Sequence, residues 1–176
     1  MRITTSIVFF LLIIAIGSIL RFQAVTQTIV EAPIRADAQK YVLYAYNLRS
    51  FGVYSDSSAG IDGHSEQIQP NMVVTPGYPL FLSLFINTNL KSINYHEVLI
   101  VQAILSILTI IMVYFLFLSL GQNWALTAAF LTACSPHLVS ASTYVLTETL
   151  FTFFFIGFLA LYSRLGNVEN PVVLYR

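Results

Sequence analysis

Two carboxylates in this chain occur where an acidic side chain could do chemistry at a membrane surface. Asp37 lies in the segment 34–48, which opens a polar stretch after the first apolar run. Glu148 lies near the start of the last long apolar run. An ionisable group at the edge of a membrane-spanning segment is costly unless it faces a wet cavity or a partner, so both acids are functional candidates.

Each acid also has a purely structural interpretation. Asp37 could cap a helix predicted over 37–50, because short acidic side chains are preferred at helix N-termini. Glu148 could be an interfacial glutamate that a helix dipole stabilises. If the last span starts at Tyr144, Glu148 lies roughly 6 Å into it, since a helix rises about 1.5 Å per residue.

The composition is typical of a membrane protein. Hydrophobic residues make up 57% of the chain and charged residues only 9%, whereas a soluble domain has about 25% charged residues. The net charge is zero and no basic patch occurs, so nucleic acid is not expected as a partner. Cys134 is interpreted as a packing residue. His64, His96 and His137 are far apart and lack the spacing of metal ligands, and the prediction includes no cofactor.

The predicted fold class is all-α, a multi-pass transmembrane helix bundle. Four spans are predicted, at about 4–22, 98–120, 124–140 and 144–163. The second is the clearest, because it has no charged residue and exceeds the roughly 20 residues that cross a bilayer. The first apolar run is short enough for a cleaved signal peptide. No small-x-small cleavage site follows Leu20, which favours a retained helix.

A long loop, about 23–97, separates the first two spans and is predicted to carry one or two interfacial helices. Tyr41, Tyr44, Ala45 and Leu48 recur at helical spacing, which suits a tyrosine-rich helix lying in the interface. Gly52 is placed where that helix should stop. Pro79 stands at a plausible first helical position, and the apolar run 80–86 that follows is predicted to be a second surface helix. A buried re-entrant piece is the alternative.

The orientation follows from the basic residues near the ends of the spans. If Arg2 is cytoplasmic, four spans return Arg164 and Arg176 to the cytoplasm, in agreement with the positive-inside rule. The long loop and Asp37 then face outside the cytoplasm. The chain is therefore predicted to be an integral, multi-pass protein of the plasma membrane that contacts membrane lipid.

A series of short motifs resembles the GT-C membrane glycosyltransferases, specifically the protein-mannosyltransferase and lipid A aminoarabinose-transferase type. Each motif is degenerate, and their order and spacing carry the likeness over nearly the whole chain. In order, they are Ala36–Tyr41, Ala45–Leu48, Gly52–Tyr54, Thr75–Pro79, Trp124–Ala129, Ser135–Pro136 and Leu146–Phe151.

The resemblance implies transfer of a sugar from a polyprenyl-phosphate donor to a hydroxyl of a glycan, lipid or protein outside the cytoplasm. Asp37 matches the position of the general base, which takes the proton of the acceptor hydroxyl as its oxygen attacks the anomeric carbon. Glu148 matches a later acidic position that helps to shape the site. Many relatives have a second acid beside the first, but here Ala38 follows Asp37. No metal is expected in this branch of the family.

The residues that would bind the donor are less well defined. Arg35 and Lys40 lie close to Asp37 in sequence and are candidates for its phosphate, although neither matches a family motif. Tyr41 is a third candidate for substrate binding.

Length favours a fragment, because members of this family are several hundred residues long. Residues 1–176 are expected to be the N-terminal part of a GT-C membrane domain, with a fifth span starting near 172. The alternative is a non-catalytic membrane module or an inactive truncated paralogue, in which Asp37 is a cap and Glu148 an interhelical hydrogen-bond partner. A transporter or channel is favoured less, because no span has a broken or charged pattern.

Overall fold

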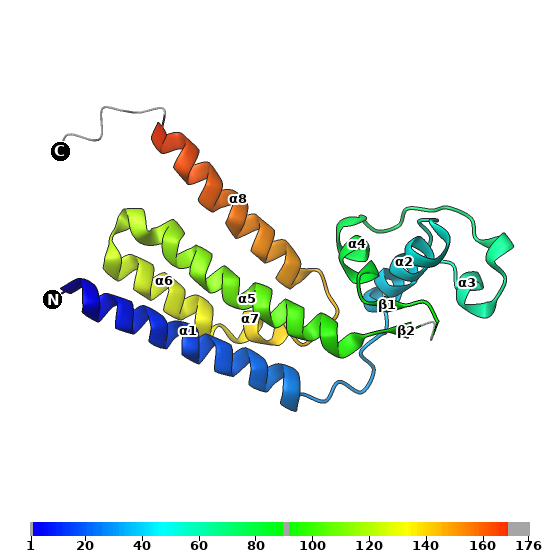
Figure 1. The fold of residues 1–176 in the computed structure, drawn as a ribbon, viewed down its shortest axis with the longest axis horizontal. Helices are drawn as coiled ribbons and strands as arrows, with labels where there is room; N and C mark the ends of the chain where they lie inside the picture. Colours follow the sequence, from blue (N-terminus) through cyan, green and yellow to red (C-terminus); the bar gives the residue numbers. More distant parts are fainter. Residues whose placement is uncertain (1, 90–91, 169–176) are drawn as a thin grey trace. The chain divides into compact units, whose positions relative to one another are not determined.

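The computed structural model describes residues 2–89 and 92–168, so the predicted start of a fifth span lies outside the described residues. The chain divides into two compact units (Figure 1). The first contains residues 1–28, 102–143 and 148–176, and the second contains residues 29–101 and 144–147.

The first unit is built of helices, most of them long. Their bounds are Arg2–Gln27 for α1, Tyr95–Phe117 for α5, Gln122–Cys134 for α6, Pro136–Ala141 for α7 and Glu148–Val168 for α8, with a 3-10 turn η2 at Leu118–Leu120. The first seven residues of α5 belong to the second unit. Among the described residues, Thr5–Gln27 and Tyr95–Leu120 are long and apolar enough to cross a membrane. The third and fourth spans stay predictions.

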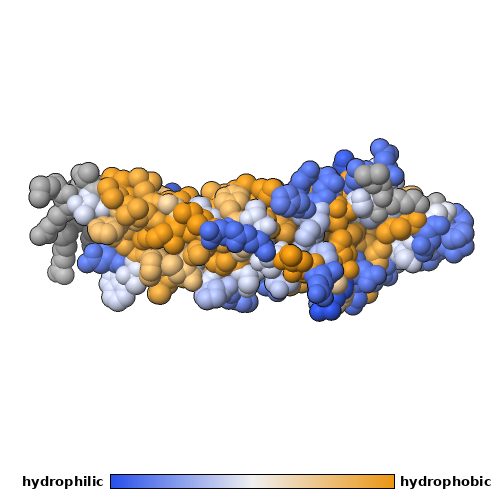
Figure 2. All heavy atoms as spheres, turned by 90° about the horizontal axis from the view of Figure 1, so that it is seen from below, coloured by the Kyte–Doolittle hydropathy of each residue, from blue (hydrophilic) through white to orange (hydrophobic). Residues whose placement is uncertain are grey.

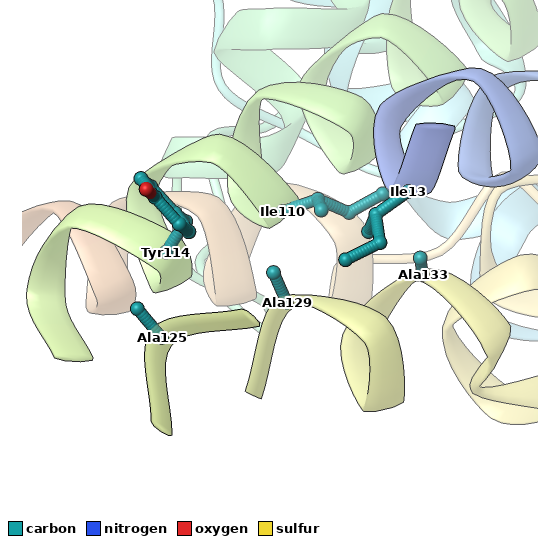
Figure 3. Packing of buried hydrophobic residues seen from close by; sticks show 6 residues of the cluster. All are labelled: Ile13, Ile110, Tyr114, Ala125, Ala129 and Ala133. Carbon is teal, nitrogen blue, oxygen red and sulfur yellow. The ribbon is translucent and has the colours of Figure 1, made fainter. Parts of the chain in front are cut away.

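Small residues let the helices of the first unit approach closely. Ala125, Ala129 and Ala133 recur every four residues along α6, and all three are fully buried (Figure 3). A Cβ atom at Gly17 of α1 would lie 2.6 Å from the Cδ1 atom of Ile110. Close contact through small side chains is how membrane helices associate, because bilayer lipid gives them no hydrophobic drive to do so.

Arg21 is buried inside the first unit, and α1 continues past it. The predicted first span stopped near residue 22, whereas α1 continues to Gln27. The physical reason is that every part of the guanidinium finds an acceptor. Its nitrogens donate to Ser106 Oγ (2.7 Å) and to the carbonyl oxygens of Gly17 (3.1 Å), Ala133 (2.9 Å) and Thr132 (3.1 Å).

The predicted third span, 124–140, is not one helix. α6 ends at Cys134, and α7 begins at Pro136 with Ser135 in an extended conformation between them. Proline has no N–H for the helix ladder and disfavours helical geometry in the residue before it. The break leaves the last carbonyls of α6 without helical partners, and Arg21 caps two of them.

The second unit replaces the predicted loop with short, packed elements. They are α2 (Asp37–Phe51), α3 (Ala59–Asp62), the 3-10 turn η1 (Ser65–Gln67), α4 (Gly77–Ser83), β1 (Ile86–Asn87) and β2 (Ser92–Ile93). The two strands pair antiparallel, with Ile86 opposite Ile93, and this hairpin is absent from the all-α prediction. Polar residues gather over this unit, whereas hydrophobic residues dominate the surface of the first (Figure 2).

The helix predicted over 37–50 is confirmed as α2, and much of its apolar stripe packs against other parts of the second unit. It ends at Gly52, whose φ of 69° is left-handed, as predicted. Tyr44 and Ala45 are fully buried, and α4 packs against α2, with the Tyr41 and Tyr78 rings 5.2 Å apart. The stripe therefore packs largely against protein, and the interfacial position of this helix stays a prediction. Pro79 is the third residue of α4, because the helix already starts at Gly77.

Buried polar side chains fix the chain that follows α2. The Asn47 side-chain amide donates to the carbonyl oxygens of Ser55 (2.8 Å) and Ser57 (2.9 Å). Burial, together with the phenols of Tyr44 and Tyr41, raises the pKa of Tyr54 above its usual value. Its hydroxyl therefore stays protonated near neutral pH and donates to the carbonyl of Val74 (2.9 Å).

We expect Asn47→Ala to loosen the segment that this side chain holds. The change leaves two carbonyl oxygens without their donor, which costs about 1–3 kcal/mol for each buried group. Limited proteolysis of the membrane-reconstituted protein should then cut within residues 52–64 at least ten times faster. Arg49→Ala, on an exposed position of the same helix, is the matched control. Equal cleavage of the two variants would contradict this role for Asn47.

Candidate active site

Asp37 lines a cavity of about 490 Å³ that lies wholly within the second unit. The size falls in the range of small-molecule sites, about 300–1,000 Å³. Two segments form the walls: the chain that leads into α2, and the turn just before α8. The lining residues are Ile29, Val30, Glu31, Ala32, Pro33, Arg35, Ala36, Asp37, Ala38, Tyr144, Val145 and Leu146.

The backbone turns sharply just before Asp37. Asp37 is the first residue of α2, and Ala36 takes the capping position with φ 54°. Ala36 is the only non-glycine residue with positive φ in the described part of the chain. Such a conformation costs about 1–3 kcal/mol and is often found at functional sites. The interpretation of Asp37 as an N-cap is therefore wrong, because no side chain caps this helix.

Three charged side chains line the cavity, and all three are exposed: Glu31, Arg35 and Asp37. Among the described residues, no ion pair or side-chain hydrogen bond joins any of them to another group. The carboxylates are free to accept a proton or a hydrogen bond from a ligand hydroxyl, and the guanidinium is free to bind an anion. Arg35 and Asp37 were both predicted as site residues, and the fold brings them to one cavity.

Glu31 is the acid that sequence reasoning missed. It belongs to no motif and lies six residues before Asp37, in a segment without regular structure. Only the path of the chain through residues 29–36 brings it to the same cavity. A weak signal was present, because the predicted loop contained a second acid upstream of Asp37 in place of the one absent at Ala38.

Two of the predicted binding residues are not among the described lining residues. Lys40 is exposed one turn further along α2. Tyr41 is half-buried and packs edge-on against Tyr78 of α4, with an angle of 82° between the rings. Because that ring is held by α4, its observed role is to pack α2 onto α4. Substrate binding by Lys40 and Tyr41 stays a prediction.

Glu148 starts a helix and does not lie four residues inside one. α8 begins at Glu148, and the residues 144–147 before it belong to the second unit. The predicted depth of Glu148 in the span is therefore wrong, and an exposed acid in the first turn is the position that a helix dipole favours. Asp37 and Glu148 belong to different units, so a shared pocket stays a prediction. The neighbouring Thr149 Oγ1 is buried and lacks a partner among the described residues.

The side-chain chemistry of the cavity suits acid–base work on a hydroxyl compound. Within residues 2–89 and 92–168, no group of three or more His, Cys, Asp or Glu side chains is placed to hold a metal ion. The described walls combine two carboxylates and one guanidinium with apolar side chains such as Ile29 and Leu146. An amphipathic molecule with an anionic group and free hydroxyls would match this mixture.

Residues 71–168, more than half of the chain, match the family model described as dolichyl-phosphate-mannose-protein mannosyltransferase. The match includes the Thr75–Pro79 motif, the helices α4 to α8 and Glu148, and it begins downstream of Asp37. No curated protein and no solved structure matches the chain.

Proposed function

Because the chain belongs to the dolichyl-phosphate-mannose-protein mannosyltransferase family, a family of integral membrane glycosyltransferases of the GT-C type, we propose that it transfers a sugar from a polyprenyl-phosphate donor to an acceptor hydroxyl outside the cytoplasm. The family description names a lipid-linked mannose and a protein acceptor. The sugar and acceptor of this chain are proposed to be of the same classes.

In the proposed reaction, Asp37 is the general base. It takes the proton of the acceptor hydroxyl while that oxygen forms a bond to the anomeric carbon of the sugar. The bond from the anomeric carbon to the phosphate oxygen breaks, and the lipid phosphate leaves with the electron pair. Attack from the face opposite the phosphate inverts the configuration. Arg35 would stabilise the negative charge on the phosphate through charge-assisted hydrogen bonds.

One observation carries this proposal: an exposed, unpaired Asp37 lines a cavity together with a cation. A general base must come within hydrogen-bond reach of the hydroxyl whose proton it takes, and no described residue holds Asp37 in an ion pair. The strained backbone at Ala36 supports the same role, since strain of this kind persists only where the surrounding structure enforces it.

The experiment that tests the function follows label from donor to acceptor. The protein is reconstituted in vesicles and given polyprenyl-phosphate mannose, labelled in the sugar, with a serine- and threonine-containing peptide. Label should appear on the peptide, and GDP-mannose supplied alone should give none. Transfer from the nucleotide sugar, or no transfer from the lipid donor, would favour the alternative of a non-catalytic membrane module.

Glu31 is proposed to hold sugar hydroxyls in the cavity. Hydrogen bonds to a charged group contribute about 1.5–3 kcal/mol, so we expect Glu31→Gln to raise the KM for the donor roughly 10-fold while kcat changes little. Steady-state transfer kinetics measure both values. Glu66→Gln is the matched control, because Glu66 is an exposed acid of the same unit that does not line the cavity. A fall in kcat at unchanged KM would contradict the binding role.

A further inference from the structure

A second cavity, in the first unit, carries a cation of its own. It lies between the C-terminal end of α5, the η2 turn and the last turns of α8, and its volume is about 340 Å³. Apolar side chains from Phe115, Leu116 and Leu118 form one wall, and Ser119, Ser163 and Arg164 supply the polar groups. The proposed sugar transfer does not use this cavity, whose lining residues lie within the matched residues 71–168.

Arg164 is the charged group of this cavity, and its described surroundings leave it free. It is exposed and forms no ion pair or hydrogen bond with the described residues. Ser119 Oγ makes only a long hydrogen bond to the carbonyl of Leu116 (3.4 Å), whereas Ser163 Oγ makes one of ordinary length to the carbonyl of Ala160 (2.9 Å). A hydroxyl hydrogen can rotate toward a stronger acceptor. The cavity can therefore offer a guanidinium fork and up to two hydroxyl donors to one anion.

The surrounding surface is typical of a membrane interface. The end of α8 and the turn from α5 to α6 lie at the same end of the helices of this unit (Figure 1). Trp124, in the first turn of α6, is 64% exposed, and Tyr162, near the end of α8, is 67% exposed. Amphipathic aromatic rings concentrate at the level of the lipid headgroups. Arg164 follows Tyr162 by two residues on α8, so this end of the helices carries a cation as well as the aromatic residues that are typical of the headgroup level.

From the charge, the hydroxyls, the apolar wall and the interfacial position, we infer that this cavity binds an anionic phospholipid of the bilayer. Arg164 pairs with the phosphate, the serine hydroxyls add hydrogen bonds, and the apolar wall holds the first carbons of an acyl chain. The wall distinguishes this ligand from free phosphate, which would gain nothing from Phe115 and Leu118. Basic pockets between membrane helices bind acidic headgroups in this way, most often on the cytoplasmic side.

A third cavity, also in the first unit, has no charged group in its described lining. It lies between α1 and α6, has a volume of about 390 Å³, and its described lining includes Phe9 and Phe130. Such a groove can take any apolar chain and cannot select a headgroup. The presence of Arg164 makes the α5–α8 cavity specific for charge.

Native mass spectrometry of the detergent-solubilised protein tests this inference. Wild type and the variant Arg164→Gln are exchanged with phosphatidylglycerol, phosphatidylcholine or inorganic phosphate. We expect phosphatidylglycerol adducts on wild type at least five-fold above those on R164Q, and no such difference with phosphatidylcholine. Arg49→Gln, which removes an exposed arginine of the second unit, should retain the adducts of wild type.

Two further variants test the roles of the guanidinium fork and of the serine hydroxyls. Arg164→Lys, which retains the charge but not the fork, should bind phosphatidylglycerol to an intermediate extent. The double variant Ser119→Ala/Ser163→Ala should lose at least two-fold in adduct abundance. Equal phosphatidylglycerol adducts on wild type and R164Q would overturn the proposal, and so would inorganic phosphate that competes at equal concentration with the lipid.

Discussion

Replacing Asp37 by Asn is expected to lower sugar transfer at least 100-fold. Asparagine has nearly the same shape as aspartate, but it cannot take the proton of the acceptor hydroxyl. General-base catalysis contributes about 10²–10⁴ in rate, so the loss should lie in that range and should fall on kcat. The measurement is transfer of labelled mannose from the polyprenyl-phosphate donor by vesicles that contain equal amounts of folded protein.

The exposed position of Asp37 lets the experiment separate loss of catalysis from loss of folding. Asp37 is exposed and no side-chain hydrogen bond holds it, so the variant should fold, losing about 0.3–1 kcal/mol of helix-dipole stabilisation. Asp37→Glu retains a carboxylate on a longer arm and should keep more activity than the Asn variant. If D37N transfers sugar at more than a tenth of the wild-type rate, Asp37 is not the base.

The second large effect is expected at Arg21, on stability. Arg21→Leu should cost about 3–5 kcal/mol, because each buried polar group left without its partner costs about 1–3 kcal/mol. A leucine fills part of the space, but it leaves the carbonyls of Thr132 and Ala133 and the Ser106 hydroxyl unsatisfied. In some proteins a buried ion pair can be replaced by apolar residues without loss, because both partners change together. Here most partners are backbone carbonyls, which no substitution removes.

Thermal unfolding in detergent measures this loss. At about 2–4 °C per kcal/mol for a chain of this size, Arg21→Leu should lower Tm by roughly 6–20 °C. Arg21→Lys should be intermediate, because one ammonium cannot reach acceptors on three helices. Ser106→Ala removes a single hydrogen bond and should cost about 1 kcal/mol. A Tm for Arg21→Leu within 2–3 °C of wild type would show that α1 and α6 do not depend on this contact.

The sequence predicted elements well where the signal was local. The run 98–120 corresponds to most of α5, and the helix over 37–50 stops at its glycine as expected, because apolar length and helix-stop chemistry are properties of neighbouring residues. The predicted end of the first span, near residue 22, was wrong, because α1 continues to Gln27. A charge normally ends a span, and three of the four acceptors of Arg21 lie 85 or more residues away in the sequence.

The site was predicted in part, for a similar reason. Asp37 and Arg35 are near neighbours in sequence, and the fold keeps them together. Glu31 joins them only because the chain from 29 to 36 runs along the cavity without regular structure, and no periodicity reports that path. The packing of α4 against α2 could not be predicted either, because the tyrosine stripe of α2 has the same pattern whether it faces lipid or a second helix.

The cap that Arg21 places on α6 has a consequence for how the chain enters the bilayer during synthesis. When α1 leaves the ribosome, neither α5 nor α6 exists, so the guanidinium has no acceptor beyond its own helix. An arginine at the centre of an inserting helix costs about 2.5–3.5 kcal/mol on the translocon scale, and Arg21, six residues before the end of α1, bears part of that cost. The first helix should therefore remain beside the translocon until residues 106–133 have been made, so that insertion of the early helix is completed by a late one.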